Sequence, residues 1–260
     1  MNEDIKKLIS NLKRQTYRRA KRELMYRYKK YTGYCSLFSS IENDGIRKVY
    51  NFLEKDAAAY MAPAVLSFAG CKLTPYTLKN KELDYKDLPS VVSVVGDAVN
   101  ASILHAIRIL LDRTSFYMHT AYSDCEIGNG IGSIEPSKKT GVMKFVDGRL
   151  KSTHDLSEEE RTIFNYILKE HDEWFHKVIQ VDNKTKHNLS AYDLYNMGVN
   201  DYPLPPILFP SSKGYYNNRE LTEEKEIPVD FEASYISRSY DLFDKILEFT
   251  TSFIITRQDK

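Results

Sequence analysis

A long apolar stripe at helical spacing in residues 157–186 constrains the fold of this chain most strongly. A capping box opens it, because Ser157 stands three residues before Glu160 and each side chain can accept from a backbone amide at the helix start. The apolar positions that follow, at a period of about 3.6 residues, are Ile163, Phe164, Ile167, Leu168, His171, Trp174, Phe175, Val178 and Ile179. This pattern predicts an amphipathic helix that must bury its apolar side against other elements.

Four further stretches repeat the helical period. We expect helices at residues 2–31, 42–61, about 92–122 and about 231–255. Together with the helix that begins at Ser157, they predict an all-α fold, because a helical bundle of about five long helices buries such stripes most simply.

Glycine and proline set the expected helix ends. Gly33 is expected to end the first helix, and Pro63 lies just beyond the second, with a less regular connection up to Pro89. Gly96 offers a possible interruption of the third helix, and the β-branched run at 91–95 is alternatively a short strand. Residues 91–95 are therefore expected either at the start of this helix or in a separate short strand.

Two other regions divide the chain. Six glycine or proline residues make 125–155 an expected Gly-rich loop, and four prolines make 198–218 an expected extended segment. For the domains, we expect residues 1–80 to form an N-terminal basic helical region that packs on the core. Residues 81–260 are expected to form the helical bundle itself.

Composition excludes several classes of protein. The 260 residues are 42% hydrophobic, which excludes global disorder, and a net charge of +1 excludes a strongly basic body of the histone type. The three cysteines are widely spaced and form no zinc or disulfide framework, so we expect no metal and no cofactor. Without a run of about 18 apolar residues, we expect no membrane partner and a cytoplasmic location.

A local excess of positive charge lies at the N-terminal end. Residues 1–31 hold eleven Lys or Arg against three acidic residues, with tyrosines interleaved at positions 17, 26, 28 and 31. Such a helix can track a phosphate backbone and stack on bases, and the candidate RNA-binding residues are Arg14, Arg18, Arg19 and Arg22. The alternative is a solvated face of a helix that serves only for packing.

The helix that begins at Ser157 ends in a polar cluster with an Asn and a His four residues apart. The pairing of ILLDRTSFYM (109–118) with WFHKVIQVDNKTKH (174–187) resembles the HEPN superfamily of small α-helical bundles, over residues 95–255. In that family an Arg-Asn-x-x-x-His motif forms a ribonuclease site, usually across a dimer. Asn183 matches the motif Asn, His187 matches the motif His, and Asp182 stands where the family has Arg.

The resemblance implies roles for the polar cluster. His187 would act as acid or base and Asn183 would orient a phosphate. Lys184 or Lys186 would supply the cation, although neither offers the planar fork of Arg, and the charge of Asp182 would repel a phosphorane-like anion. A purely structural alternative remains: these residues are the polar last turn of a helix.

Three hypotheses of function follow. The first is a HEPN-like module that binds RNA or a protein partner without cutting, in a defence or stress context. The alternative is a metal-independent ribonuclease that uses His187 and Asn183. The third is a homodimeric scaffold that pairs through the long central helices.

Other polar residues are interpreted as structural. Arg113 and His119 lie on different faces of a continuous helix, and Arg113 with Asp112 is interpreted as making polar contacts between helices. His171 and His176 are five residues apart, a spacing that does not support a zinc site on an α-helix. His105 lies among isoleucines and leucines and is interpreted as a core or boundary histidine.

Overall fold

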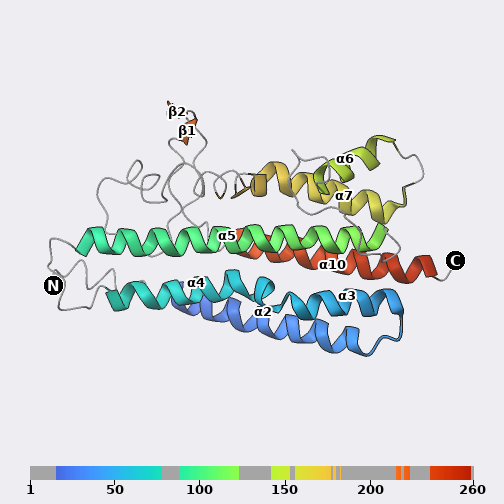
Figure 1. Ribbon diagram of the computed structural model, residues 1–260, viewed down its shortest axis with the longest axis horizontal. Coiled ribbons are helices and arrows are strands. Elements are labelled where there is room, and N and C mark those ends of the chain that lie inside the picture. Colours follow the sequence, from blue (N-terminus) through green and yellow to red (C-terminus); the bar gives the residue numbers. More distant parts are fainter. Residues whose placement is uncertain are drawn as a thin grey trace. The chain divides into compact units, whose positions relative to one another are not determined.

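The computed structural model shows an all-α protein (Figure 1), and it describes residues 16–77, 88–122, 142–152, 156–176, 178–179, 182, 215–217, 220–222 and 235–258. The all-α prediction is confirmed. The chain divides into two compact units. Unit 1 comprises Met1–Tyr28, Met61–His105 and Val181–Ile236, and unit 2 comprises Lys29–Tyr60, Ala106–Gln180 and Ser237–Lys260. The predicted domain boundary between residues 80 and 81 lies outside the described residues and stays a prediction.

The described residues contain seven α-helices rather than about five. They are α2 (Thr16–Ser39), α3 (Asp44–Lys55), α4 (Ala57–Thr77), α5 (Leu88–Tyr122), α6 (Val142–Ser152), α7 (Glu158–Glu170) and α10 (Ser237–Gln258). A π-helix, η1 (His171–Phe175), continues α7, and a small antiparallel hairpin pairs β1 (Tyr215–Asn217) with β2 (Glu220–Thr222). Among the helices described, none is both long and apolar enough to cross a membrane.

Aromatic residues form much of the core of unit 2. The ring of Tyr60 packs at 5.0 Å from that of Tyr240 and at 5.2 Å from that of Phe243, and Tyr117 lies 5.3 Å from Phe243. The buried hydroxyls are satisfied: Tyr240 donates to the backbone carbonyl of Tyr60 at 2.6 Å, and Tyr60 donates to Asp244 at 3.5 Å. The chain's many tyrosines therefore serve in part as core residues whose polar tips bond across helices.

The single helix predicted for 42–61 is wrong, because the chain breaks at Asp56. The helix α3 runs from Asp44 to Lys55 and is capped by Asn43, whose side chain accepts from the backbone amide of Ile46 at 3.0 Å. The next helix, α4, then continues to Thr77, so Pro63 lies inside a helix instead of ending one. Pro63 is buried, and burial of its apolar ring offsets the one backbone hydrogen bond that proline removes.

Two other expected helix limits are also wrong. Gly33 does not end α2, which runs on to Ser39 and buries Phe38 beyond the glycine. In the same way α5 begins at Leu88 and passes through Gly96, so the strand at 91–95 does not form. In both cases the burial of a long apolar stripe stabilises the helix by more than the cost of about 1 kcal/mol for one glycine within it.

The region around α7 agrees only in part with the sequence. The capping box is present, since Ser157 accepts from the amide of Glu160 at 3.1 Å and Glu160 accepts from the amide of Ser157 at 2.9 Å. Part of the predicted loop at 125–155 is instead α6, which packs on α7, with the ring centres of Phe145 and Phe164 6.2 Å apart. The remainder of that loop, and most of the predicted extended segment at 198–218, lie outside the described residues.

Candidate functional site

Five of the predicted site residues lie outside the described part of the chain: Arg14, Asn183, Lys184, Lys186 and His187. The predicted ribonuclease cluster therefore stays a prediction. The other three, Arg18, Arg19 and Arg22, are all described, and all three are exposed on α2.

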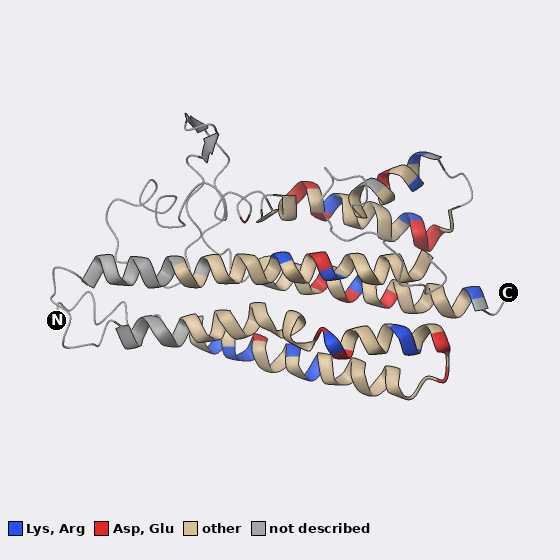
Figure 2. Cartoon of the chain, in the orientation of Figure 1, with Lys and Arg blue, Asp and Glu red and all other residues tan. Residues whose placement is uncertain are grey.

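The part of α2 that belongs to unit 1 is rich in lysine and arginine (Figure 2). Ala20 and Arg27 mark the buried side of the helix, and Arg18 and Arg22 lie opposite them, four residues apart on the exposed side. Arginines in this i, i+4 relation repel each other, which destabilises an isolated helix by roughly 0.2–0.5 kcal/mol. Packing alone does not require such an arrangement.

Arg27 differs from the other arginines of α2 in unit 1. Its side chain is 3% exposed, and its Nε donates to Oε1 of Glu23 at 2.6 Å. Its guanidinium carbon also lies 4.9 Å from the centre of the Tyr26 ring, within the range of a cation–π contact. Arg27 is therefore a structural residue and is set apart from the exposed cations.

The structure also sorts the four tyrosines that the sequence placed on this helix. Tyr17 packs its ring 5.3 Å from that of Phe68, and Tyr31 is buried and donates to the backbone carbonyl of Leu53 at 2.8 Å. Tyr26 and Tyr28 are 53% and 56% exposed. The aromatic side chains that remain accessible are thus Tyr26 and Tyr28.

Asp182, the residue that stands where the HEPN motif has Arg, is a buried carboxylate. It is 1% exposed, and its Oδ1 lies 3.5 Å from Nδ1 of His105, whose side chain is 50% exposed. His105 is thus exposed, which contradicts its interpretation as a core histidine. This pair could not be predicted from the sequence, because 77 positions separate the two residues and no spacing rule links them.

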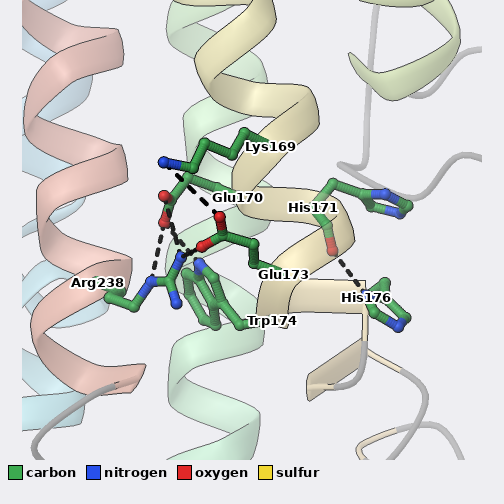
Figure 3. Close-up of polar contacts among 7 residues, drawn as sticks. All are labelled: Lys169, Glu170, His171, Glu173, Trp174, His176 and Arg238. Atoms are coloured by element: carbon green, nitrogen blue, oxygen red, sulfur yellow. Dashed lines mark hydrogen bonds and ion pairs between the residues drawn. The ribbon is translucent and has the colours of Figure 1, made fainter.

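A second polar cluster joins α7 and η1 to α10 in unit 2 (Figure 3). Buried Glu170 accepts from Nε1 of Trp174 at 2.7 Å and from Nε and Nη2 of Arg238, both at 3.1 Å. Arg238 Nη2 also donates to Glu173 at 2.5 Å. All the partners are supplied by the protein, so this cluster is an interhelical clamp and offers no open ligand position.

The contacts of this cluster also shift the pKa values of Arg238 and Glu173. Burial lowers the pKa of Arg238, but its hydrogen bonds to Glu170 and Glu173 raise it by more, so the net pKa lies above the usual value. The hydrogen bond from Arg238 is also the main reason that the pKa of Glu173 is lowered. The hydrogen bonds between Arg238 and Glu173 therefore stabilise the charged forms of both side chains.

The two histidines five residues apart, His171 and His176, are neighbours in space. Nδ1 of His176 lies 2.7 Å from the backbone carbonyl of His171, and the two ring centres are 5.6 Å apart (Figure 3). The π-helix closes i to i+5, which brings these positions together. Within the described residues, His, Cys, Asp and Glu side chains form no group of three or more that could hold a metal ion.

Arg113 makes the contact between helices that the sequence indicated. Its Nε lies 3.3 Å from Oδ1 of Asp56, and Tyr117 donates to Oδ2 of the same carboxylate at 3.4 Å. Burial raises the pKa of Asp56, and the nearby Arg113 and Tyr117 offset only part of that rise. Asp112 pairs with Arg108 on its own helix at 3.0 Å.

On the exposed face of α2, no ion pair among the described residues involves Arg18 or Arg22. No family model, curated protein or solved structure matches the chain.

Proposed function

We propose that this protein binds RNA through the exposed cationic face of α2 and does not cut it. The observation that carries the proposal is the exposure of Arg18, Arg19 and Arg22 on one helix of unit 1. Arginine pairs with phosphate through two parallel hydrogen bonds, and each phosphate neutralised releases a bound counterion. A HEPN-like module acting in the cytoplasm, in a defence or stress context, would use such a face to hold its RNA.

The contrast between exposed and buried cations supports RNA over a simple solvated helix. Where the fold needs a positive charge, it is paired: Arg27 with Glu23 in unit 1, and Lys30 with Asp244 at 2.6 Å in unit 2. No ion pair within the described part of the chain involves Arg18 or Arg22. Their charge is therefore available to an anionic partner.

Asp182 supports binding without cleavage. Metal-independent RNA cleavage needs a cation at the reacting phosphate. The residue that takes the motif Arg position is a buried carboxylate beside His105, so it cannot supply that charge. The ribonuclease alternative, with His187 and Asn183, would depend entirely on the neighbouring Lys184 or Lys186 for it.

The proposal is tested with a fluorescently labelled single-stranded RNA and the full chain. We expect wild type to raise the anisotropy of the RNA at low salt, and the triple variant Arg18→Gln, Arg19→Gln, Arg22→Gln to bind at least about tenfold more weakly, since three phosphate contacts are lost. Arg47→Gln with Lys48→Gln, which removes two exposed cations from α3, is the matched control and should bind like wild type.

The same samples are run on a denaturing gel with a chelator present. Intact RNA is expected after incubation with wild type. Cleavage by wild type that disappears in His187→Ala would show a ribonuclease and would contradict the non-cutting part of the proposal. Wild type that shows no salt-dependent binding at all would overturn the RNA-binding part and leave the homodimeric scaffold as the better hypothesis.

A further inference from the structure

Three exposed side chains of α2 form a row along one side of the helix. From Arg19 to Tyr26 is seven residues, which leaves them about 20° apart around the axis, and Arg22 lies about 40° from Tyr26. The axial rise between Arg22 and Tyr26 is about 6 Å. The row thus sets two exposed arginines on the same side of the helix as one accessible tyrosine.

The Tyr26 ring is held in place from the protein side. Arg27, itself fixed by its ion pair with Glu23, places its guanidinium carbon 4.9 Å from the ring centre. The Tyr26 side chain nevertheless remains 53% exposed. A ring that is already positioned loses less conformational entropy when a ligand stacks on it, which favours binding.

Resting on the proposed RNA-binding function, we infer that Arg19, Arg22 and Tyr26 form a subsite for an unpaired nucleotide. The two arginines hold backbone phosphates, and the adjacent base stacks on Tyr26. A base inside a duplex is already stacked on both sides, so only a single-stranded segment can use the ring. The chemical class of the preferred ligand is therefore single-stranded RNA.

Tyr28 provides a matched comparison on the same helix. It is exposed to a similar degree, at 56%, but it lies about 200° around the axis from Tyr26 and so on the other flank. The row of Arg19 and Arg22 does not extend to it. Replacing Tyr28 removes an exposed tyrosine without touching the inferred subsite.

The test compares Tyr26→Leu and Tyr28→Leu with wild type, using anisotropy with a single-stranded RNA and with a blunt RNA duplex of equal phosphate number. We expect wild type to prefer the single strand. We expect Tyr26→Leu to bind the single strand about tenfold more weakly, in line with the loss of one stacked base. Its binding to the duplex and its salt dependence should not change, and Tyr28→Leu should behave like wild type.

The possible failures are distinguishable. Equal affinity of wild type for single strand and duplex would overturn the subsite and leave general RNA binding standing. The same conclusion follows if Tyr26→Leu and Tyr28→Leu weaken the single strand equally. Absence of binding to either RNA by wild type would overturn the proposed function itself. Far-ultraviolet circular dichroism of each variant checks that the helices are intact.

Discussion

Three buried carboxylates, those of Asp56, Asp182 and Glu170, have charged or imidazole side chains beside them and so contribute to the stability of the fold. Asp56 interrupts what the sequence presents as one helix, Asp182 takes a position that the HEPN motif gives to Arg, and Glu170 fixes Trp174 and Arg238. Each of the three is buried and has a cation or imidazole beside it. Removing one partner of such a carboxylate costs more than the pair contributes in net terms, because the other partner is left desolvated.

Asp56 gives the fold a pH dependence. Burial raises its pKa above the ordinary 3.8, so just above that pH the folded state binds more protons than the unfolded state, and stability falls as the pH rises through this window. Asp56→Asn lacks this contribution. We expect its stability relative to wild type to improve as the pH rises from below 3.8 to neutral, as measured by urea unfolding.

Arg113→Leu should make the same dependence steeper, because Arg113 holds the pKa of Asp56 down. Asp44→Asn, at an exposed position of α3, is the control and should show no such trend. If wild type and Asp56→Asn change in parallel over the whole range, the raised pKa of Asp56 is refuted.

Glu170 is the central acceptor of the clamp between α7 and α10. Glu170→Gln keeps the shape but loses the charge that strengthens three hydrogen bonds, so we expect a loss of about 1–3 kcal/mol of stability. Trp174 is the chain's one tryptophan, and its emission therefore reports directly on the clamp during unfolding. Glu173→Gln, at an exposed position, should lose clearly less; an equal loss would argue against a buried clamp.

At the scale of elements, helix limits follow tertiary packing more closely than local breakers. Local signals succeed where the chemistry is local: the Ser157 capping box begins α7 as predicted. They fail at Gly33 and Pro63, where buried apolar side chains beyond the breaker extend the helix. The π-helix at His171–Phe175 has no signature in the apolar spacing at all.

Ser157→Ala tests the contribution of the capping box. Its hydroxyl accepts from the amide of Glu160, and its loss leaves that amide without a protein acceptor at the helix start. We expect a cost of about 1 kcal/mol, measured by chemical denaturation. Ser157→Asp, which keeps an acceptor at the cap, should restore most of it, and failure to restore would mean that the cap is not the cause.

Gly70 allows α4 to approach α5 closely. A Cβ at this position would lie 2.5 Å from Cγ1 of Val99, so Gly70→Ala should destabilise the protein by about 1–3 kcal/mol through overpacking. Gly33→Ala is the matched control, since a Cβ there meets nothing within 4 Å, and it should be neutral or stabilising by up to about 1 kcal/mol. Equal effects of the two changes in thermal unfolding would contradict the close contact.

For the whole molecule, the sequence predicts the fold class but not the partition into units. Apolar periodicity reveals that nearly every element is a helix, and it fixes the chain's class because strands would need a different period. It does not tell which helices meet, because that depends on contacts such as Lys30 with Asp244, more than 200 positions apart. Both compact units combine segments from distant parts of the sequence.

The sequence likewise predicts only part of the candidate site. Sequence analysis finds the cations of α2, because charge is visible residue by residue. It does not separate the exposed Arg22 from the buried Arg27, or the accessible Tyr26 from the buried Tyr31, since that distinction depends on which side of α2 is buried. The structure therefore reduces a broad basic stretch to one face of one helix.

The salt dependence of RNA affinity tests most directly whether the protein binds RNA through the exposed cations of α2. For wild type, the logarithm of the association constant should fall linearly with the logarithm of salt concentration. The triple variant Arg18→Gln, Arg19→Gln, Arg22→Gln should have a slope shallower by about 2, as expected for three lost contacts to a single strand. An unchanged slope in the triple variant would show that the RNA lies elsewhere and would contradict the account.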